Sequence, residues 1–254
     1  MQLPKSPSFS LTGKRALITG ATSGIGLGAV AALARAGAHV TAVARRQGPL
    51  DELVAALADE GADAASCALD VTDVAAVRQA LDGMEPFDVV VNSAGMARHT
   101  PAIETDPADF DAVMNVNLRA AYFLSTLTAE RMIASGRKGS IIHVSSQMGH
   151  VGGVDRAVYC ASKHAVEGMV KSMAIEWGAH GVRINTLCPT FIRTPLGEQT
   201  LSDPARRAWI EDKIKLGRIG EIGDIMGGVV YLASEASAMV TGTALMIDGG
   251  WTAG

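Results

Sequence analysis

The segment Thr19-Gly20-Ala21-Thr22-Ser23-Gly24-Ile25-Gly26 joins a short apolar run to a long alanine-rich pattern of helical period. In a strand–turn–helix, glycines in this arrangement allow a tight turn, a close approach of the backbone to a pyrophosphate, and close packing of the helix on the strand. The amino end of the helix then offers amide donors and a positive dipole to an anion. The segment predicts a dinucleotide-binding turn, and the alternative is an ordinary glycine-rich connection. Its spacing is G-x-x-x-G-x-G, and a P-loop is excluded because no Gly-Lys-Ser/Thr follows.

The carboxyl end of the next predicted strand, residues 38–44, indicates which nicotinamide cofactor such a turn would bind. An acidic residue at this point binds the ribose 2′-hydroxyl of NAD. Here Ala44 is followed by Arg45 and Arg46, so no carboxylate repels a 2′-phosphate, and a guanidinium can hold it. The sequence therefore favours NADP(H) over NAD(H).

Outward from the turn, strand-like runs alternate with longer helical patterns along the chain. This alternation predicts an α/β fold, a single domain over residues 1–254 with a doubly wound, Rossmann-like parallel sheet of about seven strands and helices on both faces. The pattern lapses at about residues 190–220, where we expect a substrate lid, because long irregular stretches in compact domains are usually functional. The expected strands are 15–19, 38–44, 64–69, 87–91, 140–144, 182–187 and 244–247, and the expected helices are 24–36, 50–60, 74–81, 108–134 with a break near 115–117, 157–179 and 224–233.

The composition narrows the class of protein. The chain is 48% hydrophobic and 19% charged with a net charge of −4, which argues against a nucleic-acid binder. No apolar run approaches the ~20 residues that a membrane helix requires, and the first residues contain no secretory signal. The three cysteines are widely spaced and the histidines are scattered, so we expect reduced thiols, a cytoplasmic protein and no metal.

A second motif lies in the helical pattern of residues 157–179. Tyr159 and Lys163 form a Y-x-x-x-K, and positions four apart share one face of a helix. A free phenol titrates near pH ~10, and a neighbouring cation lowers its pKa. The pair is therefore a candidate general acid/base, although residues of such common types also recur by chance. The serine pair Ser145 and Ser146 ends thirteen residues before Tyr159.

The two motifs, in this order, resemble the short-chain dehydrogenase/reductase family over nearly the whole chain. Further matches are Asp70-Val71, Asn92-Ser93-Ala94-Gly95, Asn117, the serine pair, and Asp248-Gly249-Gly250. The resemblance implies an NAD(P)(H)-dependent oxidoreductase that transfers a hydride between nicotinamide and an alcohol or ketone.

The resemblance also implies roles for individual residues. Tyr159 would be the catalytic acid/base, Ser146 would hydrogen-bond the substrate oxygen, Lys163 would bind the nicotinamide ribose and lower the pKa of Tyr159, and Asn117 would anchor a water in the proton relay. For Asn117 the alternative is a polar group that holds a kink inside the helix. The implied cofactor-binding residues are Gly20, Thr22, Ser23, Gly24, Ile25, Gly26, Arg45, Arg46, Asp70, Val71, Asn92, Ala94, Gly95, Tyr159, Lys163, Pro189, Ile192 and Thr194.

One segment departs from the family pattern. Members usually have Pro-Gly after the sixth strand, where this chain has Cys188-Pro189-Thr190. Threonine does not adopt a positive φ as readily as glycine, so the turn and its contacts to the nicotinamide are expected to differ.

The residues around the expected substrate position are polar. A set rich in donors suits a small oxygenated substrate, such as a sugar, a polyol or a sugar acid. The substrate residues that we predict are Arg98, Ser146, Met148, His150 and Tyr159, and the wider set of donors includes His99, Gln147, Arg156 and Arg193.

Two further expectations concern assembly and rival functions. The helix at 157–179 has apolar residues in excess of one core-facing stripe, which together with the family resemblance indicates a homotetramer. The alternative functions are a non-catalytic NAD(P)-binding sensor or scaffold, and a lyase or isomerase that uses the cofactor transiently.

Overall fold

A seven-stranded parallel sheet runs through the computed structural model, which describes residues 1–254 apart from the side chain of residue 199. The strand order is β3-β2-β1-β4-β5-β6-β7. Successive strands are added to one side of β1 up to β3 and to the other side from β4 onward, so the switch point of the topology lies between β1 and β4. The predicted doubly wound, Rossmann-like fold is thereby confirmed. The strands are β1 Arg15–Thr19, β2 His39–Ala44, β3 Ala64–Ala68, β4 Val89–Asn92, β5 Gly139–Val144, β6 Val182–Pro189 and β7 Ala244–Ile247.

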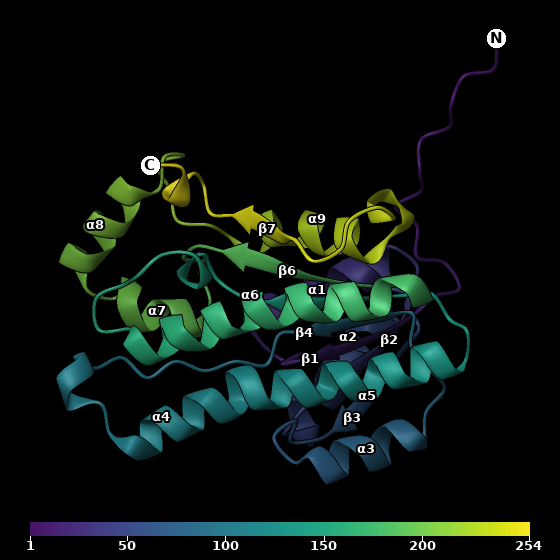
Figure 1. The fold of residues 1–254 in the computed structure, drawn as a ribbon, viewed down its shortest axis with the longest axis horizontal. Helices are drawn as coiled ribbons and strands as arrows, with labels where there is room; N and C mark the ends of the chain where they lie inside the picture. The colour runs from purple at the N-terminus through teal and green to yellow at the C-terminus, as the bar shows by residue number, and fades with distance from the viewer.

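Helices cover both faces of this sheet (Figure 1). The predicted helix at 108–134 is divided as expected, because a π-helical segment, η2 Asn115–Ala120, separates its two halves. The α-helices are α1 Gly24–Arg35, α2 Gln47–Asp59, α3 Val74–Asp82, α4 Pro107–Met114, α5 Ala121–Ala134, α6 Ala157–Trp177, α7 Pro195–Leu201, α8 Pro204–Lys213 and α9 Ile222–Ala233. Short 3-10 segments are η1 Ala102–Glu104, η3 Gln147–Gly149, η4 Gly178–His180, η5 Glu235–Ser237 and η6 Trp251–Ala253.

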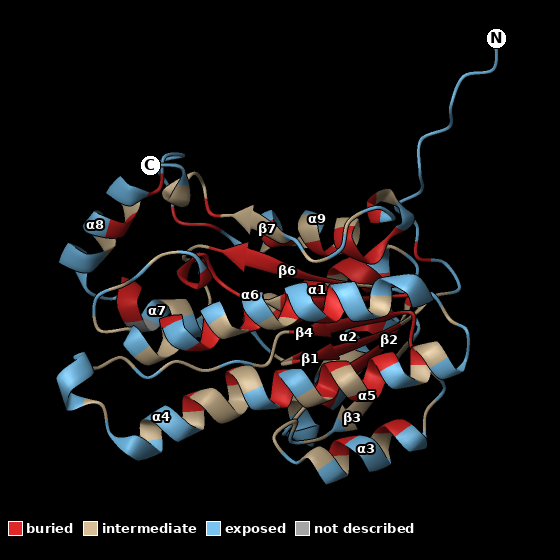
Figure 2. Ribbon diagram, in the orientation of Figure 1, coloured by how far each residue is buried: buried red, intermediate tan, exposed pale blue. Residues whose placement is uncertain are grey.

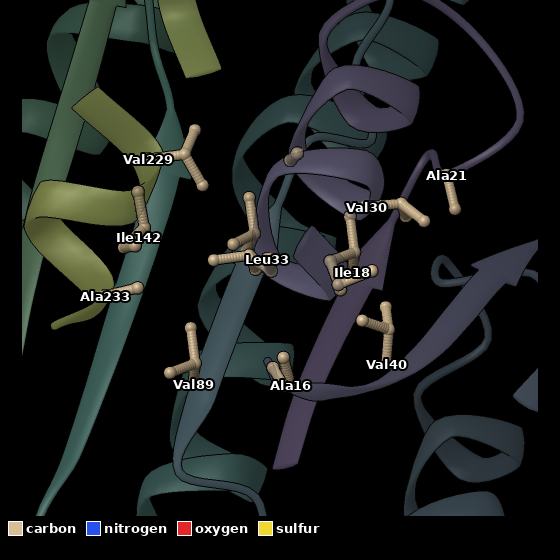
Figure 3. Packing of buried hydrophobic residues seen from close by; sticks show 14 of the residues in the cluster. Ala16, Ile18, Ala21, Val30, Leu33, Val40, Val89, Ile142, Val229 and Ala233 are labelled. Carbon is tan, nitrogen blue, oxygen red and sulfur yellow. The ribbon is translucent and has the colours of Figure 1, made fainter. Parts of the chain in front are cut away.

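Alternate strand residues build two separate hydrophobic cores. On one face, Ala16, Ile18 and Val89 pack with Leu33 of α1 and Val229 of α9 (Figure 3). The residues between them face the other way, and there they meet α3, α5 and α6. This period of two, repeated in parallel strands covered on both faces, explains why the central strands are buried along their length (Figure 2).

The segment after β6 folds into two short helices at one end of the sheet. Thr194 and Asp203 cap α7 and α8 with their side chains, and each helix starts with proline. Leu201, Ile210, Ile214 and Ile219 form a small apolar cluster beneath them, with Phe191 and Trp251 packed against it. The helices of the described residues are too short or too polar for a membrane span.

Candidate functional site

The glycine-rich turn between β1 and α1 has the geometry of an anion cradle. Gly20 has a φ of 64° and Gly24 a φ of 53°, both in the left-handed region that favours glycine. A Cβ on Gly20 would lie 2.8 Å from the Ser93 carbonyl oxygen, and one on Gly26 would overlap the Gly20 carbonyl. The turn therefore brings its backbone against the loop after β4 at the amino end of α1, where the first amides of a helix lack partners within the helix.

This turn forms one wall of a cavity of about 490 Å³ at the carboxyl ends of the strands. The cavity lies at the topological switch point between β1 and β4, which is the place where open α/β sheets bind their ligands. Sixteen of the predicted cofactor residues line it, namely Gly20, Thr22, Ser23, Gly24, Ile25, Arg45, Arg46, Asp70, Val71, Ala94, Gly95, Tyr159, Lys163, Pro189, Ile192 and Thr194.

Asn92 and Gly26 lie outside this lining, and their part in cofactor binding stays a prediction. The Asn92 side chain is buried, where its Oδ1 accepts a 2.7 Å hydrogen bond from Thr19 Oγ1 and its Nδ2 contacts His143 Nδ1 at 3.3 Å. Thr19 Oγ1 in turn accepts from the Ala94 amide at 3.2 Å. Burial lowers the pKa of His143 to about 3, so this network is neutral. Asn92 positions the loop that borders the cavity, and Gly26 packs α1 on the turn.

The polar atoms of the cavity fit a nicotinamide dinucleotide. Thr190 Oγ1 and Gln147 Nε2 are buried and have no partner among the described residues, although both residues line the cavity. Buried polar atoms are nearly always hydrogen-bonded, so these two suit the amide and hydroxyl groups of such a ligand. Among described non-glycine residues only Asp155 has a positive φ, so Thr190 carries none of the strain that its replacement of glycine suggested.

Three of the four candidate catalytic residues, Ser146, Tyr159 and Lys163, line the same cavity, and Asn117 does not. Ser146 ends the turn after β5, and its Oγ accepts a 3.1 Å hydrogen bond from the Met148 amide. Lys163 is only 5% exposed, donates to the Val144 carbonyl at 2.9 Å, and lies with its Nζ 5.6 Å from the centre of the Tyr159 ring. Burial lowers the pKa of Lys163 to about 8.

The charge environment of Tyr159 differs from the one that we predicted. Burial is the largest effect on the phenol and raises its pKa, while a hydrogen bond with Ser146 and the charge of Arg156 act in the opposite direction. The expectation that Lys163 depresses this pKa is thus corrected, because desolvation outweighs the cationic neighbours and the cation that opposes it is Arg156.

Asn117 lies in the π-helical segment and holds the loop after β4. Its Nδ2 donates to the Met96 carbonyl at 2.9 Å and to Ser162 Oγ at 3.1 Å, and its Oδ1 accepts from the Met96 amide at 2.9 Å. These contacts agree with the alternative prediction, in which Asn117 is a polar group that holds a kink inside the helix. The water relay stays a prediction.

A family model described as enoyl-(acyl carrier protein) reductase matches residues 20–252, which include the turn, the serine pair and the Y-x-x-x-K. The chain belongs to the short-chain dehydrogenase/reductase family. It is therefore an NAD(P)-dependent oxidoreductase that transfers a hydride between nicotinamide and an alcohol or ketone.

Relatives within this family cover almost the whole chain. L-xylulose reductase of Bos taurus is 40% identical over 243 residues, which are 96% of this chain and 98% of the relative. Gluconate 5-dehydrogenase of Gluconobacter oxydans (strain 621H) is 38% identical, with 96% of each chain covered. The crystal structure of a gluconate 5-dehydrogenase from Burkholderia cenocepacia J2315, in complex with NADP and tartrate, is 36% identical with a TM-score of 0.94 and covers 97% of this chain and 98% of that one.

The substrate end of this short-chain dehydrogenase differs in part from the prediction. Ser146, Met148 and Tyr159 line the cavity as predicted, whereas Arg98 and His150 do not. Arg98 lies near the surface, with its Nε 3.5 Å from Asp109. From the wider set of donors His99, Gln147 and Arg156 line the cavity, together with Thr200, which is not among the predicted residues.

His150 belongs to a separate polar cluster behind the site. Its Nε2 lies 3.5 Å from Cys188 Sγ and 3.7 Å from a Glu167 carboxylate oxygen, and Thr186 donates to that carboxylate at 2.8 Å. The three potential ligand atoms lie within 4.8 Å of one another, a grouping that the sequence spacing did not indicate. In this structure Cys188 Sγ contacts both His150 and Glu167 at hydrogen-bond distance. The expectation that the protein binds no metal stays a prediction.

Proposed function

We propose that this chain interconverts a carbinol and a carbonyl group of a small polyhydroxy substrate (a sugar, a polyol or a sugar acid) with a preference for NADP(H). The observation that carries the proposal is the convergence of Ser146, Tyr159 and Lys163 in a cavity whose other end is rich in hydrogen-bond donors. The L-xylulose reductase and gluconate 5-dehydrogenase activities of the relatives support the substrate class.

Each proposed catalytic residue has one task at a stated atom. In the oxidative direction Ser146 Oγ donates to the substrate hydroxyl oxygen and orients it. Tyr159 accepts the O–H proton as the C–H bond breaks, and it does so as the phenolate, which burial makes the minor form at neutral pH by raising the pKa. A bound NADP⁺ would supply the acceptor for the hydride that leaves the carbinol carbon with its electron pair, so that the products would be a ketone, NADPH and a proton. Lys163 binds the ribose, and Asn117 holds the relay that returns the proton to solvent.

The two arginines at the end of β2 support the cofactor preference. Arg45 and Arg46 are exposed at the rim of the cavity. The neighbouring carboxylate, Asp70, already accepts hydrogen bonds from the amide and hydroxyl of Thr72, which lower its pKa. Both guanidinium groups are thus available for a 2′-phosphate, and a relative at 36% identity binds NADP.

Replacing both arginines tests this preference. The variant Arg45→Ala/Arg46→Ala should raise KM for NADP⁺ about 30-fold or more, because it removes charge-assisted hydrogen bonds to the phosphate. KM for NAD⁺, which has no such phosphate, should change by less than about threefold. Initial rates with both cofactors give the ratio, and Arg78→Ala on the outer surface of α3 serves as the matched control. Equal losses with both cofactors would assign the arginines another role.

Assembly and location belong to the same proposal. We propose a homotetramer in the cytoplasm, with no nucleic-acid or membrane partner. Phe110 of α4, Tyr122 of α5 and Ile175 of α6 are exposed apolar side chains on neighbouring helices, which supports burial in an interface. The free cysteines Cys67, Cys160 and Cys188 are compatible with a reducing compartment. Light scattering tests the tetramer.

We also propose that residues 190–220 form a lid over the substrate. Residues 190–220 contribute Phe191, Ile192, Thr194 and Thr200 to the cavity lining, which supports closure of this segment over the substrate. Domain organisation is proposed as one unit over residues 1–254.

Turnover of a substrate panel, followed by NADPH absorbance, tests the function. Ketoses, alditols and aldonates of four to six carbons should react, with one NADPH exchanged per substrate. A sensor or scaffold would turn over no substrate in any panel, and a lyase or isomerase would convert substrate without a net change in absorbance. Reaction only with bulky apolar ketones would overturn the proposed substrate class.

A further inference from the structure

One arginine, Arg156, lines the substrate end of the cavity. Arg156 immediately precedes α6, lines the cavity, and lies three residues before Tyr159, one helical turn from the proposed acid/base. Its Nη1 lies 2.8 Å from His99 Nε2, and the His99 ring centre lies 6.4 Å from the Tyr159 ring centre, so the guanidinium is near the proposed reacting group.

Three separate segments hold this guanidinium in place. Its Nη1 donates to His99 Nε2 at 2.8 Å and its Nη2 donates to Thr200 Oγ1 at 2.9 Å, from the loop after β4 and from α7. The planar group also lies over the Phe191 ring, 5.2 Å from the ring centre. A guanidinium has five N–H groups, so this arrangement fixes its plane and leaves donors for a ligand.

The neighbours of Arg156 leave its charge uncompensated. Among the described residues no carboxylate lies within 4.0 Å of its nitrogens, and the adjacent Asp155 pairs with Arg206 at 3.2 Å instead. The imidazole that accepts from Arg156 is neutral at pH 7, since burial and the arginine charge lower the pKa of His99 to about 4. A half-buried cation without a counter-ion is costly unless an anion joins it.

The backbone beside this arginine is held in an unusual conformation. Asp155 has a φ of 58°, in a region that aspartate tolerates better than most residues, and its carbonyl accepts from the Thr100 amide at 3.2 Å. A Cβ on Gly153 would lie 2.9 Å from Met148 Sδ and 3.0 Å from Arg156 Cδ, so the loop packs closely on both side chains. The loop therefore packs against the stem of the Arg156 side chain.

We infer that Arg156 binds a substrate carboxylate, and that the physiological substrate is therefore a sugar acid (an aldonate or its keto form) and not a neutral sugar or polyol. The inference rests on the proposed function and deepens it. A carboxylate paired side-on with the guanidinium replaces the missing counter-ion. It also places the carbinol carbon a few bonds away, within reach of Ser146 and Tyr159.

Matched pairs of substrates test this inference. Threonate and threitol, xylonate and xylitol, and gluconate and glucitol differ in each pair by a carboxylate in place of a hydroxymethyl group. With NADP⁺, wild-type kcat/KM should favour the acid of the reactive pair by about 100-fold. In Arg156→Gln that preference should fall to within about threefold, mainly through KM for the acid. Arg156→Lys, which keeps the charge but not the planar fork, should give an intermediate ratio.

Two controls distinguish a specific loss of carboxylate binding from a general effect of substitution. Arg207→Gln changes a half-buried arginine of α8 that lies outside the cavity and pairs with Glu211 at 3.0 Å, and it should keep the wild-type ratio. Thermal unfolding of each variant detects loss of the fold. If Arg156→Gln does not fold, the inference is tested by the substrate preference of Arg156→Lys and of the wild type. Wild-type turnover of alditols as efficiently as acids, or equal losses for both in the variant, overturns the inference while the proposed function stands. No turnover of any pair or of the matching ketoses overturns the proposed function and the inference with it.

Discussion

Replacing Tyr159 with phenylalanine should lower kcat by about 10³-fold, within the range that general acid–base catalysis contributes. Phenylalanine fills the same volume, so the ring keeps its place against His99, whose centroid lies 6.4 Å away, and near the Lys163 ammonium. The hydroxyl that exchanges a proton with the substrate is the group lost. Because this interaction belongs to the transition state, kcat and kcat/KM should fall together.

Cofactor binding separates this role from a structural one. NADP⁺ affinity, measured by fluorescence titration, should stay within about threefold of wild type in Tyr159→Phe, since the turn and Lys163 are untouched. Tyr231→Phe on α9, which removes a hydroxyl outside the cavity, is the matched control and should retain full turnover. Near-normal turnover in Tyr159→Phe would refute the acid/base role, whatever the cofactor affinity.

The sheet and its cofactor end could be predicted because their signals are local. A strand has a period of two and a helix a period of 3.6, and the turn after β1 requires glycine where φ is positive. Parallel strands then bring their carboxyl ends to one edge of the sheet, and sixteen of the eighteen residues predicted to bind the cofactor line one cavity there, although they are scattered along the sequence.

The substrate end could be predicted only in part, because irregular segments have no period. Arg98 and His99 are adjacent in a loop, and nothing in the sequence indicates that the second faces the cavity while the first pairs with Asp109. Thr200 reaches the cavity through α7, in a stretch that we expected to be irregular. A signal was nevertheless present there, since Thr194-Pro195 and Asp203-Pro204 are each a capping residue followed by a proline suited to the first helical turn.

The electrostatics of the Y-x-x-x-K could not be derived from spacing. A cation four residues away suggests a lowered phenol pKa, yet burial raises it. The same burial acts on Lys163, whose pKa falls from 10.5 to about 8. Desolvation depends on the packing of the whole site, and both groups of the pair are disfavoured in their charged forms.

Lys163 should therefore lower stability while it supports activity. Its ammonium is buried with a single backbone partner, the Val144 carbonyl, and the pKa difference of about 2.5 corresponds to a cost of about 3 kcal/mol at neutral pH. Methionine has a similar volume and no charge. We expect Lys163→Met to unfold with a free energy about 1–3 kcal/mol higher than wild type at pH 7, since it loses one hydrogen bond and removes the desolvation cost. Its kcat/KM should fall by about 100-fold or more, because the proposed contact to the nicotinamide ribose disappears.

The pH dependence of this stability difference identifies its cause. The folded-state pKa of Lys163 lies below the unfolded value, so below pH about 8 both states carry the proton and the cost is fully present. Between pH about 8 and 10.5 the folded state releases the proton while the unfolded state still holds it, so wild-type stability rises relative to Lys163→Met. Urea unfolding of both proteins at pH 7, 8, 9 and 10 should show the difference shrinking as pH rises, with other titrating groups cancelling between the two. A difference that stays constant over this range would mean that packing, and not the buried charge, distinguishes the two side chains. A wild type that is more stable than the variant at pH 7 would contradict the desolvation cost itself.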